Sequence, residues 1–169
     1  MTCIPDSAQT KALARYKAFT SRQSELAITG SDDHTLFLWP ALDSASPKKP
    51  LARLTGHQKQ VNHVAFSPDG RYIASAGFDN SVKLWDGRTG KFIASLRGHV
   101  AAVYRVSWSS DSRMLVSASK DSTLKLWDLK THKIRVDLPG HTDEVYCVDF
   151  VADKVASGGK DKKVKIWKH

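Results

Sequence analysis

Serine, histidine and aspartate recur together in this chain, and these are the residue types of a hydrolytic triad. In such a triad the histidine takes the proton of the serine hydroxyl, and the aspartate orients the histidine. Here the combination occurs three times, each time with a tryptophan, and the serine always lies four residues before the aspartate and ten before the tryptophan. The sets are His57, Ser75, Asp79 and Trp85; His99, Ser117, Asp121 and Trp127; and His141, Ser157, Asp161 and Trp167.

The repetition favours a structural role over a catalytic one. A nucleophile is activated by a singular, accessible geometry, whereas this pattern places equivalent serines in equivalent surroundings. Buried polar groups need hydrogen-bond partners, and a fully satisfied network of them specifies one packing. We therefore predict that the sets stabilise the fold, that the chain has no catalytic residue, and that it is not an enzyme.

Metal and phosphate sites are also disfavoured by spacing. The histidines of the three sets are 42 residues apart, and no unit adds a second histidine or a cysteine pair at zinc-ligand spacing. Gly158-Gly159-Lys160 lies between strand patterns instead of opening a helix, so it does not match a phosphate-binding loop. We expect no metal, no cofactor and no small-molecule substrate.

Each set is distributed over a repeating unit of short strands. The pairs Gly56-His57, Gly98-His99 and Gly140-His141 open the units, and alternating apolar residues followed by turn residues predict the strands. A partial unit before them has no Gly-His pair but keeps Thr29, Asp33 and Trp39 at the same offsets. Strands are expected at 26–30, 35–39 and 51–54; at 61–66, 72–76, 82–85 and 92–96; at 103–108, 114–118, 123–127 and 134–138; and at 145–150, 154–157 and 164–167.

A period of 42 residues that opens on Gly-His and closes on Trp-Asp resembles the WD40 repeat, whose units build the blades of a β-propeller. The resemblance implies an all-β fold, in which about three and a half four-stranded antiparallel blades form an open arc. Closed propellers contain about four to eight blades, so the ring is expected to be incomplete. The resemblance also implies that each set is hydrogen-bonded in the order Asp, His, Ser or Thr, Trp.

The expected division of the chain has two parts. Residues 1–24 form an N-terminal segment with a short helix, because Ala12, Leu13, Tyr16 and Phe19 recur at helical spacing. Residues 25–169 form the partial propeller. Within it we expect a partial blade at 25–54, blades at 55–96 and 97–138, and a blade lacking its outer strand at 139–169.

Composition narrows the range of cellular compartments and binding partners that we expect for the chain. Lys and Arg number 26 against 17 Asp and Glu, a net charge of +9, which suits an acidic partner such as RNA or an acidic protein surface. Solubilising charge spread over strands and loops is the alternative. Cys3 and Cys147 do not suggest a structural disulfide, and no apolar run is long enough for a signal peptide or a membrane span. A reducing nuclear or cytosolic setting is expected, with no membrane partner.

The residues between the repeated positions resemble those of Notchless-type ribosome assembly factors. The resemblance extends from about Ser7 to the C-terminus and is carried by the runs Gly30–Trp39, Leu54–Val64 and Asp137–Val145. It implies a non-catalytic scaffold in biogenesis of the large ribosomal subunit, in the nucleus and nucleolus. The implied partners are pre-ribosomal large-subunit proteins, with ribosomal RNA as an open alternative.

The resemblance covers only part of the family's proteins, and the repeat pattern also fits one alternative function. It covers the C-terminal third of the family's proteins, so the ubiquitin-like domain that engages the midasin ATPase is expected to be absent, and its contact residue matches no position here. The alternative function is a WD40 adaptor or substrate receptor that binds a peptide motif in signalling or ubiquitination.

WD40 proteins contact their partners through the turns that precede the innermost strands. The matching positions flank the first valine of each such strand or precede the aspartate of a set. They are Asp32, Gln60, Asn62, Phe78, Ala102, Tyr104, Lys120, Glu144, Tyr146 and Lys160. Exposed aromatics among them would be typical interface anchors, and the alternative is that each aromatic packs against a neighbouring blade.

Overall fold

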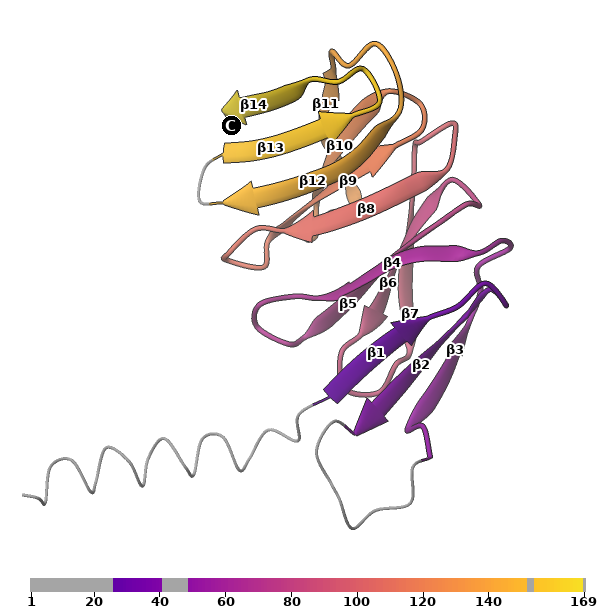
Figure 1. The fold of residues 1–169 in the computed structure, drawn as a ribbon. Helices are drawn as coiled ribbons and strands as arrows, with labels where there is room; N and C mark the ends of the chain where they lie inside the picture. The colour runs from indigo at the N-terminus through magenta and orange to yellow at the C-terminus, as the bar shows by residue number, and fades with distance from the viewer. Residues whose placement is uncertain (1–25, 41–48, 152–153, 169) are drawn as a thin grey trace, which may run out of the picture.

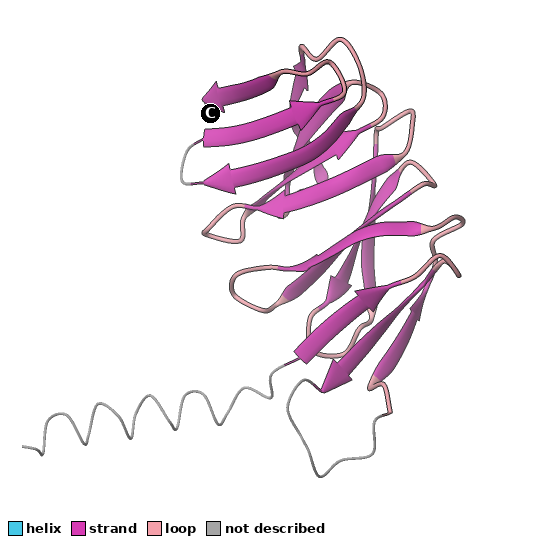
Figure 2. Cartoon of the chain, in the orientation of Figure 1, coloured by secondary structure: helices cyan, strands magenta, loops and turns pink. Residues whose placement is uncertain are grey.

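The computed structural model describes residues 26–40, 49–151 and 154–168. All regular structure in these ranges is β-strand, as Figure 2 shows. No helix in the described ranges is long and apolar enough to cross a membrane. The helix expected within residues 1–24 lies outside the described residues.

The described strands form four separate antiparallel sheets. The first contains β1 (Leu26–Gly30), β2 (Thr35–Pro40) and β3 (Ala52–Thr55). The second contains β4 (Val61–Phe66), β5 (Tyr72–Gly77), β6 (Ser81–Asp86) and β7 (Phe92–Arg97). The third contains β8 (Val103–Trp108), β9 (Met114–Ser119), β10 (Thr123–Asp128) and β11 (Lys133–Pro139). The fourth contains β12 (Val145–Val151), β13 (Lys154–Gly159) and β14 (Val164–Lys168).

The four sheets are arranged as successive blades of an open arc (Figure 1). In each of the two four-stranded sheets, the order in space follows the order in the chain. β1, β4, β8 and β12 are neighbours in succession along the arc, and the remaining strands of each sheet extend away from them. The predicted all-β class and the open arrangement of blades are confirmed.

Apolar side chains fill the space between consecutive sheets. Leu36 and Leu38 of the first sheet pack with Ile73 of the second. Leu84 and Leu96 of the second sheet pack with Val106 and Leu115 of the third, and Leu124 of the third packs with Val148 of the fourth. Because a blade is hydrophobic on both faces, each sheet depends on its neighbours for burial of its apolar side chains.

The same irregularity interrupts the first strand of each repeat. The pairing of β4 with β5 shifts between Val61 and His63, so that Asn62 is the extra residue of a β-bulge. Tyr104 of β8 and Tyr146 of β12 are the extra residues at the equivalent places. A bulge re-aims the side chain that it carries, and all three of these residues belong to the expected partner-binding positions.

Candidate functional site

The histidine of each set links the start of its repeat to the turn between the second and third strands. In the third sheet, His99 Nδ1 lies 2.8 Å from Asp121 Oδ2, and His99 Nε2 lies 2.7 Å from Ser117 Oγ. Trp127 Nε1 donates to the same Ser117 oxygen at 2.8 Å. The four residues therefore form one continuous hydrogen-bonded chain.

The other two sets repeat this chain closely. In the second sheet His57 lies 2.9 Å from Asp79 and 2.7 Å from Ser75, and Trp85 donates to Ser75 at 2.9 Å. The set of the fourth sheet has the corresponding distances of 2.9, 2.8 and 2.9 Å, for His141–Asp161, His141–Ser157 and Trp167–Ser157. In the first sheet Trp39 Nε1 donates to Thr29 Oγ1 at 3.0 Å.

The geometry satisfies each polar group inside the chain. With the proton on Nδ1, the histidine donates to the carboxylate, and its Nε2 accepts the serine hydroxyl proton. The serine oxygen in turn accepts from the indole. Ser75 and Ser117 are completely buried, so these hydroxyls have no open side from which a substrate carbonyl could approach. The arrangement holds polar atoms in place and offers no exposed nucleophile.

The carboxylates also hold the turns in which they lie. Asp121 accepts hydrogen bonds from the amides of Val100 and Thr123 at 3.1 and 3.0 Å and from the Thr123 hydroxyl at 2.6 Å. Burial disfavours the charged form of Asp121, but the hydrogen bonds from His99 and Thr123 outweigh it and hold its pKa well below the usual range. The same balance of burial against hydrogen bonds from His57 and Gln58 lowers the pKa of Asp79.

A repeated backbone hydrogen bond brings the expected partner-binding positions together. Phe78 N donates to Gln60 O at 2.9 Å. Lys120 N donates to Ala102 O at 2.9 Å, and Lys160 N donates to Glu144 O at 2.8 Å. The residue before each aspartate is thereby fixed beside the residue that precedes the bulged strand, which places both at one end of the sheets.

Three aromatic rings at this end come from three consecutive sheets. The ring centroids of Phe78 and Tyr104 are 6.2 Å apart with an edge-on arrangement, and those of Tyr104 and Tyr146 are 5.3 Å apart. Tyr104 is partly buried between the other two, whereas Phe78 is 37% and Tyr146 46% exposed. Each ring therefore packs against a ring of the adjacent sheet, and the outer two also present apolar surface to solvent.

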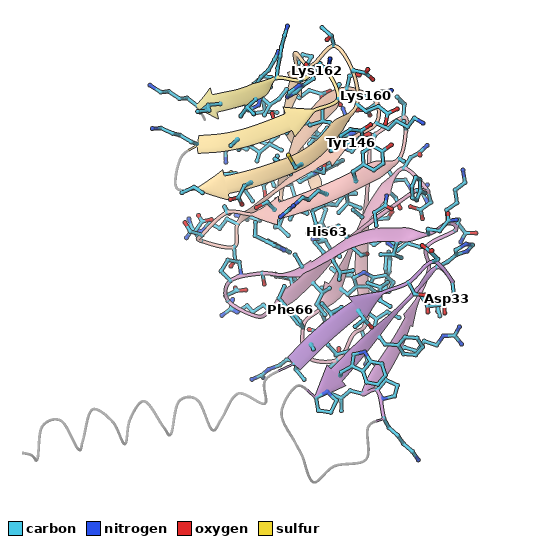
Figure 3. All side chains as sticks on the ribbon, in the orientation of Figure 1. Asp33, His63, Phe66, Tyr146, Lys160 and Lys162 are labelled. Atoms are coloured by element: carbon cyan, nitrogen blue, oxygen red, sulfur yellow. The ribbon has the colours of Figure 1, made fainter. Side chains whose placement is uncertain are left out.

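Glu144 lies at the centre of a charged cluster beside these rings. Its Oε2 accepts the Tyr104 hydroxyl at 2.8 Å, and its Oε1 lies 3.7 Å from Lys120 Nζ and 3.9 Å from Lys160 Nζ. The Tyr104 hydrogen bond and the two ammonium groups outweigh partial burial and lower the pKa of Glu144. Burial and the hydrogen bond to Glu144 raise the pKa of Tyr104 to about 12. Figure 3 shows Tyr146 and Lys160 close together at the same end of the fourth sheet.

The remaining expected positions differ in how much of the side chain they present. Ala102 is buried, so only its backbone contributes here, through the bond to Lys120. Asn62 is exposed but donates its amide to Val103 O at 2.9 Å, across to the third sheet. Gln60 and Asp32 are exposed, the latter in the turn after β1. We call Gln60, Asn62, Phe78, Tyr104, Lys120, Glu144, Tyr146 and Lys160 the turn face.

Several contacts were missed by sequence reasoning. Asp143 Oδ1 lies 3.7 Å from Lys160 Nζ and adds a second carboxylate to the turn face. Ser107 donates to Asp149 at 3.1 Å across the third and fourth sheets. The signal for the second contact is the repeat period itself, because residues 42 apart occupy equivalent places in adjacent sheets. Within the described ranges, no cluster of three or more histidine, cysteine or acidic side chains could hold a metal ion.

Comparison with known proteins agrees with the repeat pattern. The family "WD domain, G-beta repeat" matches residues 48–86, 90–128 and 132–168, which is well over half of the chain. Each of the three matched segments contains one complete set of His, Ser, Asp and Trp.

Three curated relatives are similar over a shorter stretch. Ribosome assembly protein 4 of Saccharomyces cerevisiae is 62% identical over 92 residues, covering 53% of this chain and 17% of that protein. The Notchless protein homolog of Arabidopsis thaliana is 57% identical over 89 residues, covering 53% and 18%. Protein Notchless of Drosophila melanogaster is 50% identical over 61 residues, covering 36% and 12%. The chain thus spans less than a fifth of the length of these relatives, and the resemblance to Notchless-type factors is confirmed.

Proposed function

The chain belongs to the WD40 repeat family, and from this premise we propose that it is a non-catalytic interaction scaffold in assembly of the large ribosomal subunit. The name of its yeast relative, Ribosome assembly protein 4, supports ribosome assembly as the process. The occluded serines of the buried sets support a scaffold without chemistry of its own. The nucleus and nucleolus are the proposed sites of action, where that assembly begins.

The observation that carries the proposal is the aromatic row of the turn face. Phe78, Tyr104 and Tyr146 are held by contacts with one another, so binding a partner requires little further ordering of their side chains. Rigid aromatic side chains that are partly exposed are enriched among the residues that dominate protein–protein affinity. We propose that a pre-ribosomal protein docks on this row.

The charges around the row favour a protein partner over RNA. Lys120 and Lys160 lie within ion-pair distance of Glu144, and Lys160 also lies near Asp143. A phosphate would have to compete with these carboxylates for the same ammonium groups. We therefore assign the turn face to a protein surface and retain ribosomal RNA as an outcome of the test.

Midasin enters the proposal only as a participant in the same assembly process. Its contact in Notchless-type factors is made by a ubiquitin-like domain, and no residue of this chain matches that contact. We therefore assign no midasin contact to any position here.

Affinity purification from eukaryotic cells tests the proposal. The tagged 169-residue chain should recover large-subunit precursor proteins, and Tyr146→Ala should lower their recovery by about tenfold, as truncation of an interface anchor does. Val136→Ala is the matched control, because Val136 is similarly exposed but lies on the outer strand β11. Equal recovery by the wild-type chain and Tyr146→Ala would remove the turn face from the proposal.

The adaptor alternative and the RNA alternative predict other outcomes. Recovery of signalling or ubiquitination components without ribosomal precursors would favour the adaptor. If RNA binds, its affinity should fall steeply with salt, and the Lys120→Glu and Lys160→Glu double variant should flatten that dependence. Association with proteins that varies little with salt is the result that we expect.

A further inference from the structure

Two lysines occupy equivalent places in the middle sheets but have different partners. Lys83 of β6 and Lys125 of β10 each lie two residues before the tryptophan of their set. Lys125 pairs in register with Asp137 of β11, and Lys83 pairs in register with Ser95 of β7. The third sheet therefore provides a carboxylate where the second provides a hydroxyl.

The ion pair of the third sheet shows that a carboxylate can bind the lysine at this position of a sheet. Lys125 Nζ lies 2.7 Å from Asp137 Oδ1 and 2.8 Å from Oδ2, so both carboxylate oxygens accept from one ammonium group. The Lys125 side chain is 8% exposed, whereas that of Asp137 is 54% exposed. The buried charge thus reaches its partner at the outer surface of the sheet.

Lys83 is buried to a similar degree without such a partner. Lys83 is 8% exposed, and its stem passes Gly56 beside the ring of Trp85. Among the described residues its Nζ has one polar contact, Ser95 Oγ at 3.5 Å, and lies 5.8 Å from the ring centroid of Phe92. A largely buried lysine whose ammonium group makes one long hydrogen bond is poorly stabilised compared with a paired one.

We propose that Lys83 and Ser95 form a receptor site for one carboxylate of a partner protein. The incoming aspartate or glutamate would take the place relative to Lys83 that Asp137 takes relative to Lys125. The Ser95 hydroxyl donates to no other group among the described residues, so it can donate a second hydrogen bond to the same carboxylate. The site is formed by the two outer strands of the second sheet, β6 and β7, at the edge opposite β4, and does not rest on the function proposed above.

The surroundings indicate the kind of segment that would carry the carboxylate. Phe92 is 53% exposed at the start of β7, and Ile93 follows it as an exposed apolar residue. Among the described strands, β7 pairs with β6 alone, so its other edge is available to an extended segment. These features fit an extended segment in which an acidic residue stands near apolar ones, as in addition of a strand to a sheet edge.

Thermal unfolding tests, without any ligand, whether a carboxylate placed beside Lys83 stabilises the fold. Ser95→Asp supplies from within the chain what the partner would supply, and it should raise the unfolding midpoint by about 2–4 °C. Ser95→Asn is the matched control, since it has nearly the same shape without the charge, and it should give no rise. A Ser95→Asp midpoint at or below that of Ser95→Asn would overturn the proposal.

The chain's own acidic residues are tested in the same assay. Asp43 belongs to the segment 41–48, outside the described residues, and follows β2 of the neighbouring sheet. Asp43→Asn should leave the midpoint unchanged. A fall with Asp43→Asn that Ser95→Asp restores would identify Asp43 as the partner of Lys83 and overturn an external one.

Binding is tested with two probes on the whole chain. A capped pentapeptide of alternating valine and glutamate should shift the Lys83 Cε resonance saturably, and its glutamine counterpart should not. Ser95→Asp should abolish the shift, and its higher unfolding midpoint shows that the fold is retained. No shift with the acidic peptide, or a shift that persists in Ser95→Asp, would contradict the proposal. An equal or larger shift with inorganic phosphate would replace the protein carboxylate by a phosphate ligand.

Discussion

The middle sheets and the end sheets contain the same hydrogen bond in different surroundings. The indole of Trp127 donates to its serine at 2.8 Å and that of Trp167 at 2.9 Å, so the local geometry is nearly identical. Trp127 is 1% exposed because the second sheet covers it, whereas Trp167 and Trp39 are only partly buried. The geometry of a set is thus encoded within one repeat, whereas the burial of its tryptophan depends on whether the sheet lies in the middle or at the end of the arc.

This difference has an energetic consequence. A hydrogen bond in a region of low dielectric is electrostatically stronger, and loss of one partner there leaves a polar group without water to replace it. The same substitution should therefore be more damaging in a set whose tryptophan is buried than in one whose tryptophan is partly exposed.

Asp121→Ala should have the largest effect. It removes the partner of His99 and of three donors in the adjoining loops, and we expect unfolding to become easier by about 2–4 kcal/mol. Urea unfolding followed by tryptophan fluorescence measures the change. Unaltered stability, together with loss of a hydrolytic activity, would overturn the structural assignment of the set.

Asp161→Ala should destabilise the chain less than Asp121→Ala does. Asp161 makes the equivalent bonds to His141, Thr142 and Lys163, but Lys163 provides no hydroxyl donor like that of Thr123, and the tryptophan at the end of this set is partly exposed. The two variants are compared in the same urea experiment. Equal losses would show that neither the Thr123 hydroxyl bond nor the burial of the tryptophan adds to the strength of the network.

Lowering the pH should show how much the carboxylates of the middle sheets contribute to the stability of the fold. The pKa values of Asp79 and Asp121 are lower in the folded chain than the ordinary 3.8, so the folded state holds these protons less tightly than the unfolded state. Their contribution to stability is then complete above the unfolded pKa and is lost as the pH falls below about 4. Urea midpoints between pH 5 and pH 2 should fall less steeply in Asp121→Asn than in the wild-type chain, and parallel slopes would contradict this.

The exposed face of the fourth sheet should affect association more than folding. Val164 is 78% and Ile166 71% exposed, although the equivalent residues of the second sheet, Val82 and Leu84, are completely buried by the third. Exposed apolar surface of this kind promotes association, and sedimentation velocity at micromolar concentration should detect self-association. Val164→Lys with Ile166→Lys should reduce it with little change in unfolding. A wild-type monomer with a sharp two-state melt would contradict the expectation.

Strand positions could be predicted from the sequence because the repeat reports them several times. Val61–Phe66 and Val103–Trp108 were predicted at their observed bounds, and the ends of most other strands differ by one or two residues. Alternating apolar residues mark the two buried faces of each blade, and the turn residues mark where the pairing stops. Local chemistry decides these features, so a single repeat contains the information.

The partners of individual side chains were harder to predict because they depend on the adjacent sheet. Equivalence of position placed Ala102 beside the turn face but did not indicate that its side chain is buried. The role of Glu144 between Tyr104 and two lysines requires the sheets to be placed together first. The missing carboxylate at Lys83 became visible only through comparison with Lys125 in the next sheet.

Exchange of the tryptophan indole protons with solvent tests the central claim most directly. Trp39, Trp85, Trp127 and Trp167 each donate the same type of hydrogen bond, at 2.8–3.0 Å, and so serve as matched reporters within one molecule. Protection of the indole protons from exchange, measured by NMR, should be greatest and similar for Trp85 and Trp127, smaller for Trp167, and smallest for Trp39. Equal protection of all four indoles, or protection of Trp39 that matches Trp85, would contradict the view that neighbouring sheets stabilise the sets.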